Sequence, residues 1–349
     1  VSTNSVILTG RSPQNYTAAV TVNGSPAAWT AHNTASMAGT YGFWNMTPFE
    51  LTARVTPISI AALDADANVL KSRTLTLVKA TNTVDKGAAN VTTNETWNYP
   101  DSVVILTNSI TVNNGASLIL PAGTVLLMNP GVTLTVADGT LDILGTAAEP
   151  CWILPGGAGS TWSLALSGNS GLTAGNTTFV AGTLSAGTGT GVELTDCTLH
   201  DHDAASGIID ADNAAVTLVR CIVEDYAKAA FTGSTLWAED CLFAQMSEAG
   251  LELDGGTGTV QACTIRAPVG VAGVDGLRAL GGATVDADGL LIEHTAGAGV
   301  AAFEAGTAVN IADSLIVGAG AGILRSSPAT VSGSHNTLSA CTTGLQGDQ

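Results

Sequence analysis

Charged side chains are scarce in this sequence, and basic ones are the scarcest. Charged residues make up 11% of the 349 residues, with 11 Lys and Arg against 29 Asp and Glu, for a net charge of −18. A phosphate backbone requires a basic surface, so this balance argues against nucleic acid as a partner. No apolar run approaches the roughly 20 residues that cross a bilayer as a helix, so we expect no membrane insertion.

Helical patterns and familiar catalytic motifs are also missing. No segment repeats Glu, Lys, Leu and Ala at helical spacing, whereas 41 glycines and abundant Thr, Asn and Ser favour short strands and tight turns. No P-loop, dinucleotide fingerprint, Gly-x-Ser-x-Gly or His-Glu-x-x-His sequence occurs. These absences predict an all-β fold and no cofactor, with calcium as the one candidate ligand.

The charge is unevenly divided along the chain. Residues 1–80 hold five bases and three acids, a balance of +2, and residues 81–349 hold six bases and 26 acids, a balance of −20. The chain begins at Val1, as a mature secreted protein or a fragment does. This acidic, lysine-poor, turn-rich composition resembles that of bacterial secreted and surface proteins, and we expect an extracellular or cell-surface location.

Residues 1–80 read as a small β domain. Alternating runs such as YTAAVTVNG and FELTARVTPISIAAL are separated by turn sequences, among them the Asp64 to Asn68 stretch, which predicts a hairpin turn. The pattern "LTGRSP…VTVNGSPAAW…ALDADANVL" resembles the Ig-like modules of bacterial secreted proteins, which implies an Ig-like β-sandwich. Residues 81–102 are predicted to be a linker and N-terminal cap, in which Trp97 and Tyr99 cover the start of the second domain.

From Val103 the chain consists of similar units. The same short motif recurs, and its second position falls at Thr177, Cys197, Cys221, Cys241, Cys263, Gly289, Ser314 and Asn336. The steps of 20–26 residues, with two or three short strands and no helix, indicate a β-solenoid. The opening "GASLILPAGTVLLMNPGVTLTVADGTLDILGTAAEP" resembles the right-handed parallel β-helix family over residues 85–349. The resemblance implies a right-handed parallel β-helix of roughly a dozen coils over 103–349, but no single function, because that family includes lyases, adhesins, tailspikes and structural proteins.

The cysteines follow this repeat. Cys197, Cys221, Cys241 and Cys263 should stack on the inner face, about 4.8 Å apart, which exceeds the Cβ–Cβ separation of about 3.8 Å in a disulfide. Free, buried thiols are therefore expected. The sequence places Cys151 and Cys341 outside the register.

A cluster rich in His and Asp follows Cys197. Strand alternation puts Cys197 inside and His200 outside, which argues against a shared zinc ion. The acidic turn beside them offers hard oxygen ligands suited to calcium. The candidate metal ligands are Asp201, Asp203, Asp210 and Asp212. A solvated turn is the simpler interpretation.

Two classes of function remain open. The best grouping for a polysaccharide lyase or glycoside hydrolase is Lys228 with Glu224 and Asp225, beside Asp201 and Asp203, but no family motif accompanies it. Trp152, Trp162 and Trp237 are either sugar-stacking platforms or parts of the core. The first hypothesis is a non-catalytic extracellular structural protein that self-assembles, as a homo-oligomer or polymer, through the segment VSTNSVILTG and an open last coil. The alternative is a β-helix that binds or degrades a polysaccharide.

Overall fold

The structure, a computed structural model, describes residues 5–13, 17–30, 41–157, 159–200 and 207–347. These residues form strands and turns and contain no helix. The described part of the chain accordingly has no helix long and apolar enough to cross a membrane. The chain divides into two compact units, Val1–Thr83 and Val84–Gln349.

The first unit consists of two small antiparallel sheets. One has the strand order β1-β5-β4 and the other the order β3-β2-β6-β7. The strands are β1 (Ser5–Pro13), β2 (Ala19–Val22), β3 (Ser25–Pro26), β4 (Ala28–Thr30), β5 (Tyr41–Glu50), β6 (Val55–Leu63) and β7 (Val69–Val78). Leu8, Val20, Val22, Trp44 and Ile58 form its buried core. This arrangement is compatible with the Ig-like module that the sequence suggested.

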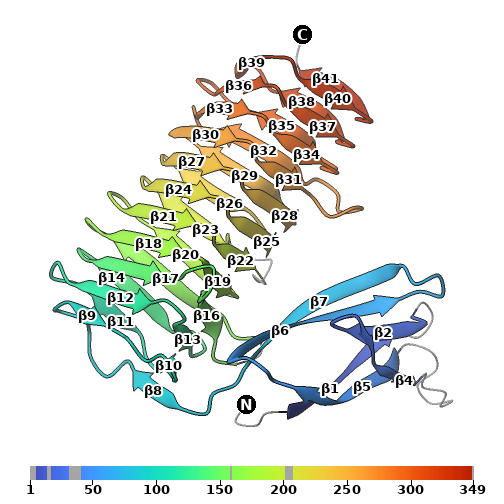
Figure 1. The fold of residues 1–349 in the computed structure, drawn as a ribbon. Coiled ribbons are helices and arrows are strands. Elements are labelled where there is room, and N and C mark those ends of the chain that lie inside the picture. Colours follow the sequence, from blue (N-terminus) through green and yellow to red (C-terminus); the bar gives the residue numbers. More distant parts are fainter. Residues whose placement is uncertain (1–4, 14–16, 31–40, 158, 201–206, 348–349) are drawn as a thin grey trace. The chain divides into compact units, whose positions relative to one another are not determined.

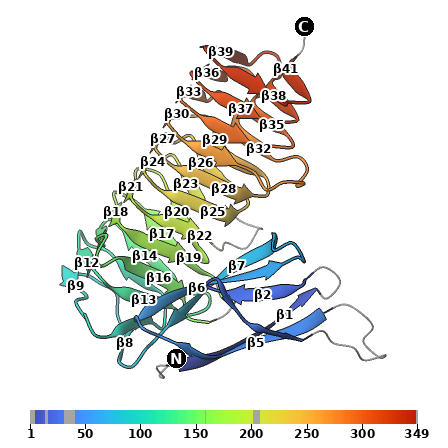
Figure 2. The same cartoon turned by 45° about the vertical axis from the view of Figure 1, so that its right-hand side comes forward.

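The second unit is a parallel β-solenoid of about eleven turns, built from three long sheets (Figures 1 and 2). Sheet I contains β8 (Thr83–Lys86), β10 (Val103–Leu106), β13 (Val125–Met128), β16 (Cys151–Pro155), β19 (Thr177–Val180), β22 (Thr198–His200), β25 (Ile222–Tyr226), β28 (Leu242–Met246), β31 (Thr264–Arg266), β34 (Leu291–Glu293), β37 (Leu315–Val317) and β40 (Thr337–Ser339).

Sheet II contains β11 (Ile110–Val112), β14 (Thr133–Ala137), β17 (Trp162–Ser167), β20 (Gly182–Ala186), β23 (Ile209–Asp212), β26 (Ala229–Thr232), β29 (Ala249–Asp254), β32 (Asp275–Leu280), β35 (Ala298–Ala302), β38 (Ala321–Arg325) and β41 (Thr343–Gly347). Sheet III contains β9 (Glu95–Thr96), β12 (Ser117–Pro121), β15 (Thr140–Leu144), β18 (Gly171–Gly175), β21 (Gly191–Thr195), β24 (Ala215–Val219), β27 (Thr235–Glu239), β30 (Thr257–Gln261), β33 (Thr284–Asp288), β36 (Ala308–Ala312) and β39 (Thr330–Ser334).

Each strand pairs in parallel with the strand one coil away, so equivalent residues stack in rows. In sheet III, for example, Leu118 pairs with Leu141, Leu141 with Leu172, and Leu172 with Val192. These residues point inward and are buried, while their chain neighbours point outward. Because side chains alternate, each short strand places its apolar residues on the inner face, and each coil buries that face against the coils above and below. Short apolar runs are therefore enough to build a continuous core. The predicted all-β class and parallel β-helix are confirmed.

The segment predicted as a linker and cap forms the first coil. Strands β8 and β9 join sheets I and III, and Val91 bridges to Val112. Trp97 is buried, its Nε1 donates a hydrogen bond to Glu95 Oε2 at 2.9 Å, and Lys86 Nζ lies 5.0 Å from the centre of its ring. A large aromatic side chain and two charged groups therefore close this end of the solenoid.

One turn, between sheets III and I, sets the register of the repeat. A residue with positive φ comes first, and the inward residue called here the ladder position comes directly after it. The positive-φ residues are Asn176, Asp196, Arg220, Asp240, Ala262, Gly289, Asp313 and His335. Asn, Asp and Gly adopt this conformation most readily, which accounts for their frequency in the turn.

The structure corrects the predicted ladder at two coils. Gly289 has a φ of 63° and occupies the turn, so the buried Leu290 fills the ladder position. From the sequence, Gly289 is assigned to the ladder position because it is small, like the cysteines at the equivalent position of other coils. Cys151 pairs with Thr177 and therefore belongs to the ladder, although the sequence places it outside the register. The ladder contains Thr124, Cys151, Thr177, Cys197, Cys221, Cys241, Cys263, Leu290, Ser314 and Asn336.

Candidate functional site

The predicted calcium ligands are only partly described. Asp201 and Asp203 lie outside the described residues. Asp210 and Asp212 are on β23 of sheet II, where both side chains are exposed, and Asp212 Oδ1 accepts a hydrogen bond from Asn213 Nδ2 at 2.7 Å. Within the described ranges, no three His, Cys, Asp or Glu side chains are grouped so that they could hold a metal ion. The calcium site stays a prediction.

His200 does not face solvent, so that prediction is wrong. Its side chain is 9% exposed, and Leu199 beside it is also buried. The same pair of consecutive buried residues occurs one coil earlier at Phe179 and Val180, and His200 pairs with Val180. Two consecutive residues are therefore buried at this point, where the chain passes from sheet I toward sheet II.

The ladder cysteines bind backbone groups. All six cysteines of the chain are free, and only Cys341 is partly exposed. The Sγ atom of Cys241 lies 3.3 Å from the Cys221 nitrogen, which donates to it, and 3.2 Å from the Glu239 carbonyl oxygen, to which it donates. The thiol thus satisfies backbone groups at the turn, as well as filling space in the core.

In later coils, Ser and Asn side chains at the ladder position hydrogen-bond to the backbone in the same way. Ser314 Oγ accepts from the Leu290 nitrogen at 3.0 Å and donates to the Ala312 carbonyl at 2.7 Å. Asn336 Oδ1 accepts from the Ser314 nitrogen at 3.0 Å. Most ladder residues are Cys, Ser, Thr or Asn, small side chains that hydrogen-bond to the backbone, whereas Leu290 only fills space in the core.

Hydrogen bonds between neighbouring thiols shift their pKa values in opposite directions, lowering those of Cys197 and Cys241 and raising those of Cys221 and Cys263. Burial adds to the rise in pKa at Cys221 and Cys263. Burial also raises the pKa of Cys151. The ladder cysteines are free and buried, as the sequence predicted for Cys197, Cys221, Cys241 and Cys263.

Ion pairs gather on the outer side of sheet II. Lys228 Nζ lies 2.5 Å from Glu252 Oε1, and Arg278 Nη1 lies 2.8 Å from Glu252 Oε2. Arg278 Nε also contacts Asp275 Oδ2 at 2.8 Å, and Asp275 Oδ1 accepts from the Ala298 nitrogen at 2.7 Å. The two carboxylates are each bound by a base, and their side chains are only 13% and 11% exposed.

This cluster includes Lys228, the base of the predicted lyase-like grouping. Its partner Glu252 is 24 residues away in sequence, one coil further along. Burial alone would raise the pKa of Glu252, but hydrogen bonds from Lys228 and Arg278 outweigh it and lower that pKa. An anionic carboxylate held between two cations suits neither a general acid nor a free base. The cluster is best understood as a stabilising ion-pair network.

The carboxyl groups with resolved pKa shifts all favour the anion. The hydrogen bond from Arg220 lowers the pKa of Asp196, and the side chain of Asn68 lowers that of Asp64. Asp64 Oδ1 also accepts from the nitrogens of Asp66 and Asn68, which confirms the predicted hairpin turn. Glycoside hydrolysis needs one protonated carboxyl, and none of these groups supplies it.

The three candidate tryptophans have different environments. Trp162 is 3% exposed, and its Nε1 donates to the Val180 carbonyl at 2.8 Å, so it belongs to the core. Trp152 on β16 is half-buried. Trp237 on β27 points outward from sheet III and is 40% exposed. Of the three, Trp237 is therefore the one available to a ligand.

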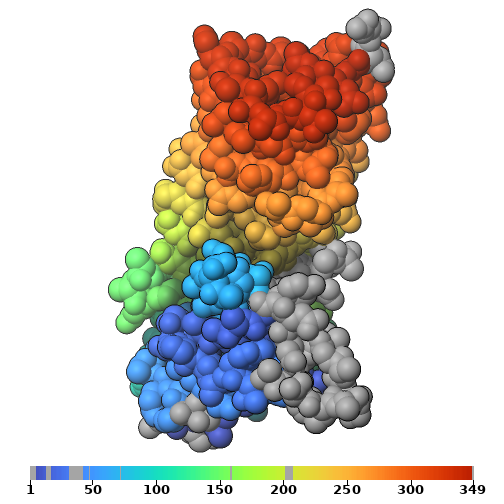
Figure 3. All heavy atoms as spheres, turned by 90° about the vertical axis from the view of Figure 1, so that its right-hand side faces the viewer, coloured from blue at the N-terminus to red at the C-terminus, as the bar shows by residue number. Residues whose placement is uncertain are grey.

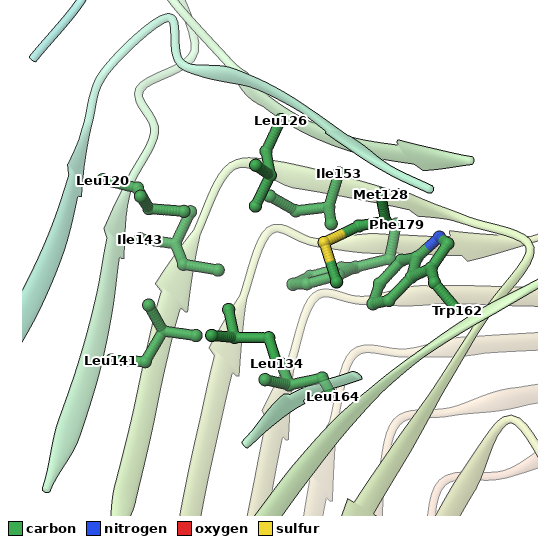
Figure 4. Close-up of a pocket in the computed structure, with 10 residues that line it drawn as sticks. All are labelled: Leu120, Leu126, Met128, Leu134, Leu141, Ile143, Ile153, Trp162, Leu164 and Phe179. Carbon is green, nitrogen blue, oxygen red and sulfur yellow. The ribbon is translucent and has the colours of Figure 1, made fainter. Parts of the chain in front are cut away.

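The solenoid interior contains a small apolar cavity near Trp162 (Figure 4). Its volume of about 10 Å³ is close to the minimum that holds one water molecule. The lining residues are Leu120, Leu126, Met128, Leu134, Leu141, Ile143, Ile153, Trp162, Leu164 and Phe179. A space this small and without polar lining is a packing defect between large side chains, and it cannot receive a substrate.

The last coil forms one end of the solenoid. Strands β39, β40 and β41 are each the terminal strand of their sheet. Their inward residues Val331, Leu338 and Leu345 continue buried rows but are themselves incompletely covered, and Leu345 is 72% exposed. Figure 3 shows the C-terminal part of the solenoid, in red, at one end of this unit. Edge strands are normally protected by charges, proline or a covering element.

Two solved structures show a distant likeness to this chain. The catalytic domain of a GH87 alpha-1,3-glucanase, solved in complex with nigerose, is 10% identical and has a TM-score of 0.29, over 99% of this chain and 86% of that one. A Geobacillus virus E2 protein, ORF18, is 12% identical with a TM-score of 0.26, over 69% and 54%. No family model matches the sequence. The curated proteins contain no match either.

Proposed function

We propose that this chain is a non-catalytic, extracellular structural protein whose solenoid associates with a second copy through its last coil. The observation that carries the proposal is the contrast between the two ends of the solenoid. The first coil is closed by the buried Trp97 and carries charged residues in its strands. The last coil presents three edge strands that contain no charged residue. Native proteins normally protect such strands with charges, proline or a covering element, and these three strands contain neither a charge nor proline.

The charge distribution favours a second copy as the covering partner. Residues 81–349 carry a balance of −20, so two copies repel each other along most of their surfaces. Residues 326–347, which include the last coil, contain no Asp, Glu, Lys or Arg. This end is therefore the place where two acidic chains approach with the least repulsion. Pairing of edge strands would satisfy backbone groups, and covering Val331, Leu338 and Leu345 would bury apolar surface.

Substitution of an exposed residue tests the contact without disturbing the fold of the subunit. Leu345→Asp places a charge in the last coil at a residue that is 72% exposed, and Val269→Asp is the matched control at a loop residue that is 82% exposed. Light scattering after size exclusion should give dimers or larger assemblies for the unchanged protein and the control. It should give monomers for Leu345→Asp. Circular dichroism checks that both variants remain folded.

Two results would contradict the proposal. Negative-stain microscopy that shows only single short rods at high protein concentration would exclude assembly. An equal loss of assembly in both variants would exclude the last coil as the contact. An extracellular location is part of the same proposal, and antibody labelling of intact source cells tests it separately.

The observations favour this proposal over a lyase or hydrolase. Lys228 is held by Glu252 at 2.5 Å, and the cavity near Trp162 is too small for a sugar. An ultraviolet assay for unsaturated products on a panel of polysaccharides, with and without calcium, provides the direct check. Activity that disappears in Lys228→Ala would overturn the non-catalytic assignment.

A further inference from the structure

Trp237 belongs to a straight row of polar residues on the outer face of sheet III. Parallel register pairs Glu193 with Thr217, Thr217 with Trp237, and Trp237 with Thr259. The row continues from Thr259 through Asp286 to Asn310. We call Glu193, Thr217, Trp237, Thr259, Asp286 and Asn310 the Trp237 row. It covers five coil steps of about 4.8 Å, or about 24 Å.

The indole is presented above its neighbours in this row. The flanking residues Thr217 and Thr259 carry much smaller side chains than Trp237, which is 40% exposed. Its Nε1 donates to Glu239 Oε2 at 3.3 Å, which restrains the ring relative to its own strand. A ring of this size on a solvent-facing sheet leaves apolar area in water unless a ligand covers it.

The groups around the ring offer acceptors and hydroxyls but no positive charge. The strands of sheet III contain Glu95, Asp142, Glu193, Glu239, Asp286 and Asp288 and no Lys or Arg. Two to four coils further along the same row, Asn310 Nδ2 donates to Asp286 Oδ1 at 3.4 Å, and Ser332 Oγ donates to Asn310 Oδ1 at 3.4 Å. Carboxylates accept hydrogen bonds and repel anions. The face therefore excludes acidic ligands and suits a ligand rich in donors.

We propose that the Trp237 row is a binding strip for a linear polysaccharide without acidic groups. The apolar face of a pyranose ring packs on the indole, and its hydroxyl groups donate to the carboxylates of Glu193 and Asp286 and exchange hydrogen bonds with Thr217 and Thr259. A chain laid along the row meets the indole at one coil and a polar side chain at each of the other coils. The strip is independent of the proposed assembly contact, because it lies on the side of the solenoid and not at its end.

Titration calorimetry on the whole chain tests the strip with three hexasaccharides. They are a neutral β-1,4-linked glucose hexamer, the corresponding glucosamine hexamer and a galacturonate hexamer. Binding of either non-acidic hexamer, at least tenfold weaker in Trp237→Ala, supports the proposal. Leu144→Ala is the matched control, because Leu144 is an exposed apolar residue on the same sheet face, and its affinity should stay within twofold of the unchanged protein.

Other outcomes overturn the strip. Binding of the galacturonate hexamer with equal affinity would contradict the charge argument, and absence of binding to both non-acidic hexamers would contradict the ligand class. Equal losses in Trp237→Ala and Leu144→Ala would show that the indole has no specific part. Trp237→Phe, which keeps an aromatic face, should lose less affinity than Trp237→Ala. A result that rules out polysaccharide binding would not affect the assembly proposal, because assembly is tested separately by measuring particle mass with light scattering.

Discussion

The Cys221 backbone nitrogen donates a hydrogen bond to the Sγ atom of Cys241 one coil further along, at 3.3 Å. This bond connects two coils at the turn between sheets III and I, inside a fully buried environment. We expect Cys241→Ser to change the free energy of unfolding by less than about 1 kcal/mol, because Ser314 shows that a hydroxyl fits the position. Cys241→Ala should cost about 1–3 kcal/mol, since it leaves a buried N–H unpaired.

Urea unfolding of the solenoid measures both variants. The comparison depends on hydrogen bonding, because Ser and Ala are both smaller than Cys and create similar losses of packing. Equal destabilisation by Ser and Ala would mean that the ladder thiols contribute only volume.

The six free thiols should react at two very different rates. Cys341 is partly exposed, and the other five are buried. Burial also raises the pKa of Cys151, which lowers its thiolate fraction at pH 8. We expect one thiol to react with Ellman's reagent in the native protein and the remaining five to react only after denaturation. Cys341→Ser should remove the fast phase alone. A second fast thiol in that variant would contradict the burial of the ladder.

Much of the solenoid can be predicted because its turn restricts residue type. Asp-Cys and similar pairs recur since the first residue adopts positive φ and the second fills a small inward position. Prediction from the sequence fails at coils where the turn residue and the inward residue are not the usual types. Gly289 resembles a ladder residue because it is small, whereas its φ places it in the turn. Cys151 escapes the pattern because its coil lacks the usual preceding residue, with Pro150 standing there instead.

The outer surface is much harder to predict. Partners on neighbouring coils are separated by variable loops, so contacts cannot be read from fixed spacing. Lys228 is close in sequence to Glu224 and Asp225, whereas its bond to Glu252 spans 24 residues. The neighbours of Trp237 become visible only when register is known across five coils. The burial of His200 departs from the alternating pattern, since Leu199 beside it is buried too.

The Lys228–Glu252–Arg278 network should make stability depend on pH. Glu252 has its pKa lowered from the usual 4.5 in the folded protein. Its contribution is therefore fully present above about pH 4.5 and is lost as the pH falls through the lowered value. Glu252→Gln should destabilise the solenoid by about 1–3 kcal/mol at pH 7, because two bases lose a charged acceptor. The difference from the unchanged protein should shrink as the medium is acidified.

Thermal unfolding at several pH values between 7 and 3 measures this difference. Glu248→Gln serves as a control, since Glu248 is exposed and lies in the same coil. A penalty for Glu252→Gln that is constant over the whole range would show that the charge of Glu252 does not act in the folded state.

Gly256 should tolerate alanine far less well than Gly270. Both have positive φ, 70° and 86°, so both substitutions cost about 1–2 kcal/mol of backbone strain. A Cβ at Gly256 would also lie 2.1 Å from the Ser234 carbonyl oxygen, while nothing lies within 4 Å of one at Gly270. Gly256→Ala should therefore lower the melting temperature clearly more than Gly270→Ala. Similar shifts would mean that the coil relaxes around the new methyl group.

The turn at Ala262 should be improved by glycine. Ala262 has a φ of 51°, a conformation that costs a residue with a Cβ about 1–2 kcal/mol and costs glycine nothing. Ala262→Gly should raise the free energy of unfolding by about 1 kcal/mol after the extra chain entropy of glycine is subtracted. Ala312→Gly is the opposite control, because Ala312 lies in strand β36, where glycine costs about 0.5–1 kcal/mol. Urea unfolding compares the two, and destabilisation by both would show that the turn conformation carries no strain to release.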